Sequence, residues 1–427
     1  MYLDRNNKFQ ISNRMKTSVQ ISLLSLLMVF SICTLSCKNQ VNKKAVDKKV
    51  EIQEYDVVVA TYYFPNWGPF EDSEWKRVNE AKPRFEGHQQ PKVPLWGYTN
   101  ENEPQHMAQR IDAAADNGLD VFIFDWYFAD NIPPSGEDEP YGWSGSKYLY
   151  MALEEGFLKA PNNDRMKFSL MWCNHDLQYN HKGAVKPETF ENLTDYVIEN
   201  YFSHPSYWLI DGCPYFSIYQ MFAFLETFGN DYGKAAEAME RFREKVKAAG
   251  FPDLHLNAVL WGVKDDMEKL IEEFGIKSTT SYVWIHHNDL PDAPATEYTK
   301  AADDYFKSVE SGGGINGLEN PASEIPVPYH VNVSMGWDSS PRCKDVPDSE
   351  WLERTDYPYL PVMVNNTPEL FKKYLAKAKA MTMKKPTNAR IITINSWNEW
   401  GEGSYLEPDT INGMAYLKAI KEVYGDN

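Results

Sequence analysis

The chain has 427 residues, with 61 acidic and 43 basic side chains and a formal net charge of −18. Such an acidic surface repels nucleic-acid phosphates, which excludes DNA and RNA as expected partners. Hydrophobic residues make up 43% of the chain, enough for a large core, and the 14% of aromatic residues suits either that core or a cleft in which aromatic rings stack on sugar rings.

Residues 15–37 have the features of a bacterial secretory signal. A lysine precedes the apolar run Ile21–Ile32, which is too short and too often interrupted by serine for a membrane span. Ser36 and Cys37 then resemble a lipoprotein cleavage site. We expect translation to start at Met15, residues 1–36 to be a leader, Cys37 to be lipidated, and the polar residues 37–54 to form a tether.

This reading predicts a bacterial extracytoplasmic lipoprotein of the outer membrane, on its periplasmic face or at the cell surface. The lipid anchor would be its only contact with the membrane. The three cysteines of the body (Cys173, Cys213 and Cys343) are widely spaced and odd in number, so they predict neither a disulfide framework nor a metal site.

From residue 55 onward, short runs rich in β-branched and aromatic residues alternate with amphipathic segments. Eight such alternations predict one α/β domain, a (β/α)8 TIM-type barrel over residues 55–427, with long loops on its C-terminal face. A doubly wound sheet is the alternative, but no glycine-rich phosphate loop follows the first strand. The predicted strands are 57–63, 121–127, 168–172, 215–219, 254–261, 279–284, 330–337 and 391–397.

Several helices have clear ends in the sequence. A helix over 104–117 begins at a proline and stops before a glycine, and one over 234–249 also stops before a glycine. Thr367 is a predicted N-cap for a helix that runs from Pro368 to about residue 382. Around residues 207–219 the pattern fits either one strand or two.

The eighth strand leads into Trp-Asn-Glu-Trp-Gly-Glu-Gly at residues 397–403. Glutamate is rarely buried without a partner, and a glycine-rich turn can present two of them to one small volume, as acid–base chemistry on a sugar requires. A solvated acidic loop is the plain alternative. The flanking tryptophans favour a catalytic pair, Glu399 and Glu402.

Polar and aromatic residues also follow the other strands and the first long loop, where a barrel builds its active site. Asp125 is open to two interpretations, a salt bridge to Arg342 or a substrate contact, and His175 to a ligand contact or a core role. His286 and His287 lack metal-ligand spacing, so we expect no metal and no cofactor. The predicted substrate contacts are Tyr62, Tyr63, Trp67, His88, Trp96, Asp125, Trp126, Asn174, His175, Trp284, His286, Trp337, Asp338, Arg342 and Asn398.

The motif at 398–403, with Leu-Glu-Pro at 406–408, resembles the signature of glycoside hydrolase family 99. Tyr-Tyr-Phe-Pro at 62–65, residues 118–126 and Gly-Trp-Asp at 336–338 look still more like its WbsX-type relatives. The resemblance covers about residues 55–427. It implies a barrel enzyme that cleaves α-linked glycans internally and retains configuration through a 1,2-anhydro sugar.

In this mechanism Glu399 would take the proton from the sugar's own 2-hydroxyl group, and Glu402 would protonate the leaving oxygen and then activate water. The chain departs from the family-99 mannosidases at Gly401, where they carry histidine, so the choice of sugar stays open. We therefore predict a glycoside hydrolase acting on an oligosaccharide or polysaccharide. The alternatives are a WbsX-type glycosyltransferase, whose nucleotide-sugar donor would lie across the membrane, a non-catalytic glycan-binding lipoprotein, or a polysaccharide lyase.

Overall fold

The computed structural model describes residues 57–128, 148–174, 184–263, 266–354 and 356–425. Residues 54–427 belong to one compact unit. The predicted leader with Met15, the lipidated Cys37, the tether and His175 lie outside the described residues. None of the described helices is long and apolar enough to cross a membrane.

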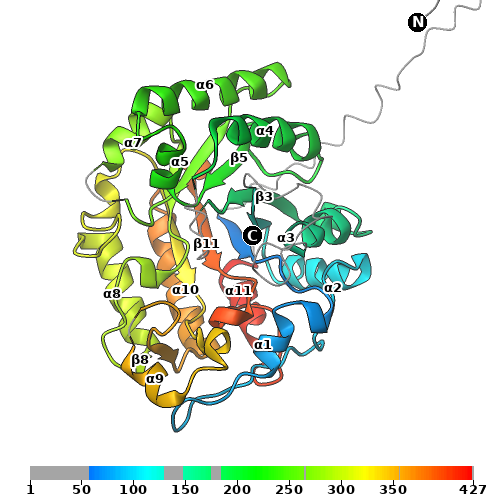
Figure 1. Cartoon of the computed structure of the whole chain (residues 1–427), viewed down its shortest axis with the longest axis vertical. Coiled ribbons are helices and arrows are strands. Elements are labelled where there is room, and N and C mark those ends of the chain that lie inside the picture. Colours follow the sequence, from blue (N-terminus) through cyan, green and yellow to red (C-terminus); the bar gives the residue numbers. More distant parts are fainter. Residues whose placement is uncertain (1–56, 129–147, 175–183, 264–265, 355, 426–427) are drawn as a thin grey trace, which may run out of the picture. The chain divides into compact units, whose positions relative to one another are not determined.

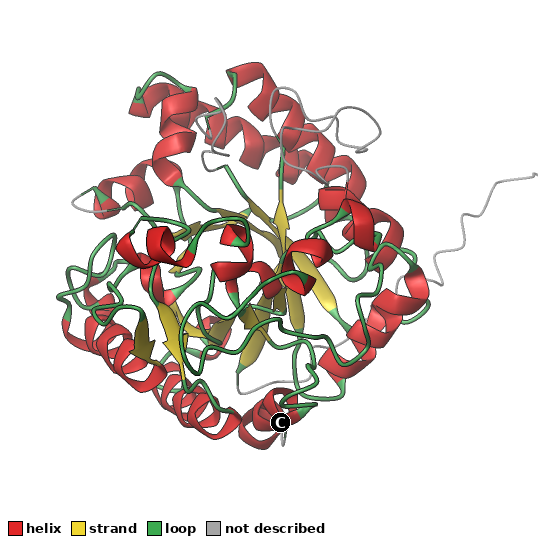
Figure 2. Ribbon diagram, turned by 60° about the horizontal axis from the view of Figure 1, so that its bottom comes forward, coloured by secondary structure: helices red, strands yellow, loops and turns green. Residues whose placement is uncertain are grey.

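Eight parallel strands close into a barrel at the centre of the fold, which confirms the predicted (β/α)8 architecture (Figures 1 and 2). Each strand pairs with its neighbours, and pairing of β3 with β5 completes the ring. All eight strands coincide with predicted ones to within a few residues. They are β1 (Val58–Tyr63), β2 (Val121–Trp126), β3 (Lys167–Trp172), β5 (Cys213–Ile218), β6 (His255–Val259), β7 (Ser278–Thr280), β9 (Tyr329–Ser334) and β11 (Ile391–Asn395).

Helices form the outer layer around these strands (Figure 2). They bury the apolar outward faces of the strands, as parallel sheets require. The described helices are α1 (Trp75–Asn79), α2 (Pro104–Ala115), α3 (Tyr148–Met151), α4 (Pro187–Val197), α5 (Met221–Thr227), α6 (Tyr232–Ala248), α7 (Met267–Phe274), α8 (Tyr298–Ser311), α9 (Asp348–Glu353), α10 (Pro368–Thr382) and α11 (Ala415–Tyr424). Of these, α1 lies against the 3-10 turns Ser340–Cys343 and Trp400–Glu402, and α9 packs through Trp351 in a small separate cluster with Cys343 and Val362.

The helix ends follow local chemistry. The Thr367 side chain accepts a hydrogen bond from the Leu370 amide at 3.4 Å, with proline in the first turn of α10, as predicted. Helix α6 begins two residues before the predicted Lys234, because the Asp231 carboxylate accepts from the Lys234 amide at 3.2 Å and caps the helix there.

The ambiguous stretch before β5 contains two strands. β4 (Leu209–Ile210) pairs antiparallel with β5. The two residues between them, Asp211 and Gly212, both have positive φ (52° and 79°), as a two-residue hairpin turn demands. This hairpin extends the barrel wall at the start of β5.

The barrel interior is unusually polar for this architecture. The Thr280 and Thr393 hydroxyls lie 3.0 Å apart, and the Asn332 amide donates to the Thr393 hydroxyl at 3.2 Å. In another layer, the Ser217 hydroxyl donates to the Asn257 amide oxygen at 2.8 Å. Because buried polar groups need partners, these bonds stabilise the interior in place of aliphatic layers.

Loss of the α10 cap provides a test of this helix boundary. We expect Thr367→Ala to lower the free energy of unfolding by about 1 kcal/mol, because the Leu370 amide loses its acceptor. Urea titration followed by tryptophan fluorescence measures the change. Thr410→Ala, at an exposed threonine, serves as the control and should stay within about 0.5 kcal/mol of the parent. Equal losses in the two variants would contradict the assignment.

Candidate active site

A tight hairpin at the C-terminal end of β11 carries both glutamates of the motif. β12 (Asn398–Glu399) pairs with β13 (Ser404–Tyr405), and a 3-10 turn over Trp400–Glu402 joins them. Gly403 closes the turn with φ 64°, and a Cβ there would lie 2.6 Å from the Cβ of Asp338, so glycine is required. The two glutamates of this hairpin are only 2% and 8% exposed.

Arg342 holds these two carboxylates together. Its Nη2 lies 2.9 Å from Glu399 Oε1, and its Nη1 lies 2.9 Å from Glu402 Oε1. The Tyr357 hydroxyl donates to the same Glu402 oxygen at 3.0 Å. The planar guanidinium therefore spans the pair, and both carboxylates face one small volume.

The electrostatics of the pair suit proton transfer. Burial raises the pKa of Glu399 well above its ordinary value and also raises the pKa of Glu402, while the Arg342 charge opposes both shifts. The mutual repulsion of the glutamates and the charge of Asp125 add to the rise at Glu399. At Glu402 the hydrogen bond from Tyr357 lowers the pKa.

Asp125, at the end of β2, is a third carboxylic acid of the site. Its Oδ2 accepts a hydrogen bond from the Tyr282 hydroxyl at 2.8 Å, so its partner is a tyrosine. Its Oδ1 is buried without a hydrogen-bond partner. Burial raises the pKa of Asp125 well above its usual range, and the charge of Glu402 adds to the rise. A protonated Asp125 can donate a hydrogen bond to a bound molecule.

His88 and Asp338, both predicted site residues, form a buried pair beside the hairpin. The Arg84 amide donates to His88 Nδ1 at 3.0 Å, so Nε2 carries the proton and donates to Asp338 Oδ2 at 2.8 Å. Gln90 donates to that oxygen at 2.7 Å. Burial alone would raise the pKa of Asp338, but the hydrogen bond from His88 lowers it. The Asp338 amide in turn donates to the Glu402 carbonyl at 2.6 Å, which fixes the turn.

Aromatic side chains form the opposite side of the site. The imidazole of His286 stacks on Trp261 with ring centroids 4.9 Å apart, and the Tyr219 hydroxyl lies 3.4 Å from His286 Nε2. Trp261 and His286 are half-buried, so their faces can stack on a sugar ring. Tyr282 connects this aromatic side to Asp125.

Sequence reasoning missed several residues of the site. Strand periodicity could have found most of them, because residues two apart share a face: Tyr127 lies two after Asp125, and Cys173 and Tyr219 follow the ends of β3 and β5. Their pKa values are all raised well above normal, mainly by burial, so they are neutral hydrogen-bonding groups. The missed residues are Tyr127, Cys173, Tyr219, Trp261, Tyr282 and Tyr357.

Five predicted substrate contacts are buried in packing contacts of their own, and their role in substrate binding stays a prediction. Tyr63 donates to Glu101, Trp67 packs 4.3 Å from Trp75, Trp126 stacks on Phe128, Trp284 lies against Tyr298 and Tyr305 of α8, and the Asn398 amide binds the Phe64 backbone.

Four other predicted substrate contacts have structural contacts inside the barrel or around it. Tyr62 points into the barrel, where its hydroxyl donates to the Ser281 carbonyl at 3.2 Å. Asn174 exchanges two 2.8 Å hydrogen bonds with the Gln220 backbone and connects the ends of β3 and β5. Trp337 is buried, with its ring centroid 6.3 Å from Tyr357. Trp96 is half-buried and packs against the core.

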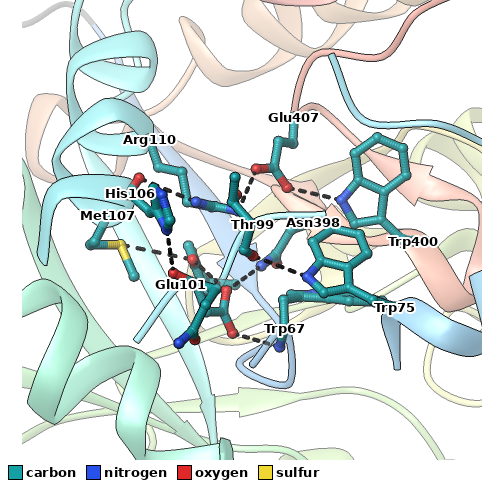
Figure 3. Close-up of polar contacts among 12 residues, drawn as sticks. Trp67, Trp75, Thr99, Glu101, His106, Met107, Arg110, Asn398, Trp400 and Glu407 are labelled. Carbon is teal, nitrogen blue, oxygen red and sulfur yellow. Dashed lines mark hydrogen bonds and ion pairs between the residues drawn. The ribbon is translucent and has the colours of Figure 1, made fainter. Parts of the chain in front are cut away.

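Behind the hairpin lies a buried charged cluster that the sequence did not predict (Figure 3). Glu407 pairs with Arg110 at 2.9 Å, both side chains being 1% exposed, and accepts from Trp400 Nε1 at 2.9 Å. Glu101 accepts from the Trp67 amide at 2.8 Å and from Asn398 at 3.3 Å, and burial raises its pKa to about 8. Arg110 and Glu407 therefore tie helix α2 to the turn that carries the glutamates.

Among the described residues no group of three or more histidine, cysteine or acidic side chains is arranged to hold a metal ion. His287 is instead a buried structural residue, with Nε2 2.6 Å from the Ser281 hydroxyl and Nδ1 3.2 Å from the Ile315 carbonyl. Burial lowers the pKa of His287 to about 4.

A family model described as "Glycosyltransferase WbsX" matches residues 66–420. The chain belongs to the WbsX family. Curated relatives include "Uncharacterized protein WxcX" of two strains of Xanthomonas campestris, each 22% identical over 389 residues, or 85% of this chain and 49% of that protein. The chain thus spans about half the length of the curated relatives it matches.

Solved structures share the fold of this WbsX protein. The family-99 endo-α-mannosidase from Bacteroides thetaiotaomicron superposes with a TM-score of 0.51 at 13% identity, covering 87% of this chain and 97% of that one. A "Glycoside hydrolase-like protein" gives 0.52 at 15% identity, covering 87% and 94%. At these identities the likeness establishes the fold, which agrees with the family-99-like resemblance.

The buried pair behind the hairpin gives a stability test. We expect Arg110→Met to destabilise the protein by about 3–5 kcal/mol, because it leaves the Glu407 carboxylate buried without its cation. Urea unfolding measures the loss. Arg165→Met is the matched control: its ion pairs with Asp112 and Asp116 are exposed, so its cost should stay near about 1 kcal/mol or less. Similar costs for the two arginines would refute the structural role of the cluster.

Proposed function

We propose that this WbsX protein is a glycoside hydrolase that cleaves an α-linked glycan, with Glu399 and Glu402 as its acid–base pair. The observation that carries the proposal is the geometry of the pair: two buried carboxylates of raised pKa on one guanidinium, at the C-terminal end of a (β/α)8 barrel. The aromatic faces of Trp261 and His286 across the site suit a sugar ring.

The reaction proceeds with retention through the sugar's own 2-hydroxyl group, as the family-99 resemblance suggests. Glu399 accepts the 2-hydroxyl proton while that oxygen attacks C1, and Glu402 donates a proton to the leaving oxygen. Water then opens the 1,2-anhydro sugar with the same groups in reverse. This assignment requires Glu399 to be ionised and Glu402 to be protonated when the glycan is bound.

Substitution of either glutamate tests the pair. We expect Glu399→Gln and Glu402→Gln each to reduce kcat by at least about 10²-fold while glycan binding persists, because a positioned acid or base contributes 10²–10⁴-fold. Reducing ends released from mannans, fucans, rhamnose-containing glycans and host glycans, with product masses, give the readout. Glu324→Gln, at an exposed glutamate, is the control. Near-normal rates in both active-site variants would end the proposal.

Substrates with different leaving groups distinguish the role of the acid, Glu402, from that of the base, Glu399. A substrate with an activated aryl leaving group needs little protonation, so it should restore much of the rate of Glu402→Gln and none of that of Glu399→Gln. The reverse pattern would exchange the two assignments and leave the hydrolase proposal intact.

A glycosyltransferase is the second candidate, because the family description names that activity. It requires transfer from an activated sugar donor to an acceptor. Incubation with radiolabelled nucleotide sugars and candidate acceptor glycans, in parallel with the reducing-end assay, distinguishes the two. Transfer without release of reducing ends would replace the hydrolase by the transferase.

We also propose that the protein acts outside the cytoplasm as a lipoprotein anchored through Cys37. The support is the signal-like sequence before this residue. In a bacterial host, the full chain should take up radiolabelled palmitate and sediment with membranes, whereas Cys37→Ala should lose the label and Cys213→Ala should keep it. Labelling that survives Cys37→Ala would rule out this anchor.

A further inference from the structure

Gly401 lies in the turn between the two glutamates, and its backbone does not explain why it is glycine. It is not among the described residues with positive φ, so any residue could adopt its conformation. The constraint is spatial. A Cβ at this position would lie 3.2 Å from Arg342 Nε, 3.6 Å from Arg342 Nη2 and 3.6 Å from Glu399 Oε1. The guanidinium occupies the space that a side chain at 401 would need.

Arg342 reaches this space from a separate loop. It belongs to the 3-10 turn Ser340–Cys343 after β9, and its guanidinium carbon lies 5.9 Å from the ring centroid of Phe64. The fork makes one 2.9 Å contact with each glutamate. A planar, always-charged fork can hold two separate carboxylates at once, which an ammonium group on a flexible chain does less well.

We propose that Gly401 and Arg342 act as a functional pair: the missing side chain admits the guanidinium between Glu399 and Glu402, and the guanidinium sets the spacing and the charge state of the two carboxylates. Arg342 is thus a positioning residue for the acid–base pair. The activity readout of this proposal rests on the proposed hydrolase function, whereas the placement and ionisation of the carboxylates do not.

The other groups around the pair do not duplicate this role. Asp125 adds negative charge next to Glu399 only when it is ionised, and Glu74 raises the pKa of both glutamates. Tyr357 supplies only a neutral hydrogen bond to Glu402. Tyr127, Cys173, Tyr219 and Tyr282 have pKa values raised by burial and stay neutral near pH 7. Arg342 is the cation that both glutamates share.

The direction of the pKa shift expected on removal of Arg342 follows from the positive charge of its guanidinium. The guanidinium favours the ionised form of both glutamates, so its removal raises both pKa values and the pair keeps its protons to higher pH. The deprotonation that activates the base and the deprotonation that disables the acid should therefore both occur at higher pH. The pH profile of kcat/KM should therefore shift to higher pH as a whole.

Carboxyl-group NMR on protein labelled with ¹³C at the glutamate carboxyl carbon tests the proposal without any substrate. Glu399→Gln and Glu402→Gln assign the two signals. We expect Arg342→Met to move both titration midpoints up by about one to three pH units, the range that a close cation typically produces. Arg342→Lys should recover part of this shift. Tyr357→Phe is the matched control, because it removes only a neutral hydrogen-bond donor. It should shift the titration midpoint of Glu402 and leave that of Glu399 nearly unchanged.

Gly401→Ala tests the spatial half of the proposal with Arg342 still present. The added methyl forces the guanidinium to give way by a few tenths of an ångström, so both midpoints should move in the same direction as in Arg342→Met, by a smaller amount, in a protein with unchanged circular dichroism. This variant also carries the test if Arg342→Met does not fold. Unchanged midpoints in Gly401→Ala, or in a folded Arg342→Met, overturn the proposal.

The activity assay then separates the two proposals. Shifted midpoints together with a shifted kcat/KM profile support both. Shifted midpoints in a protein that hydrolyses no glycan of the panel support the Gly401–Arg342 pair and remove the hydrolase proposal. Hydrolysis with unchanged midpoints in the variants supports the hydrolase and removes the pair.

Discussion

The contact of one guanidinium with two buried glutamates is the interaction on which the site depends. Two buried carboxylates facing the same small volume repel each other, and burial alone would leave both of them protonated. Arg342 offsets that cost with two 2.9 Å contacts. The pair can then hold a proton on one member and a charge on the other, which is the state that acid–base chemistry needs. The small residue at 401 and the loop after β9 both serve this contact.

The hairpin can hold this geometry because it is fixed from two sides. On one side, the Asp338 amide binds the Glu402 carbonyl, and His88 and Gln90 hold the Asp338 carboxylate. On the other side, Glu407 connects the Trp400 indole to Arg110 on α2. Burying these charges costs solvation energy, but a buried network of paired charges allows the hairpin few alternative conformations. The reacting groups therefore lie on a rigid turn, although that turn is glycine-rich.

The sequence predicted the barrel and all eight strands, and its turn motif pointed to the two glutamates that the structure brings together on Arg342, because strand periodicity and a turn motif are local signals. It did not predict the orientation of individual side chains. Tyr62 and Tyr63 are neighbours, yet one points into the barrel and the other under a helix to Glu101. Asp125 and Trp126 are also neighbours with different orientations, because Asp125 accepts a hydrogen bond from Tyr282 and Trp126 stacks on Phe128. The alternation of side chains along a strand could have separated these pairs. The contacts of Arg342 with the glutamates and the cluster around Glu101 join segments far apart in sequence, which no local pattern reveals.

The family description names sugar transfer, whereas the function proposed above is hydrolysis, yet retaining hydrolysis and sugar transfer make similar demands on this site. Each needs a group that removes a proton from the incoming hydroxyl, whereas only hydrolysis of a glycosidic bond also needs a proton for the departing oxygen, because a nucleotide leaves as a phosphate anion. The two differ in the acceptor, which is water in one case and a sugar hydroxyl in the other, and in how the donor is activated. One glutamate acting as a base would therefore serve either candidate. The distinction must come from the half-buried surface around Trp261 and His286, where an acceptor sugar would have to stack and exclude water.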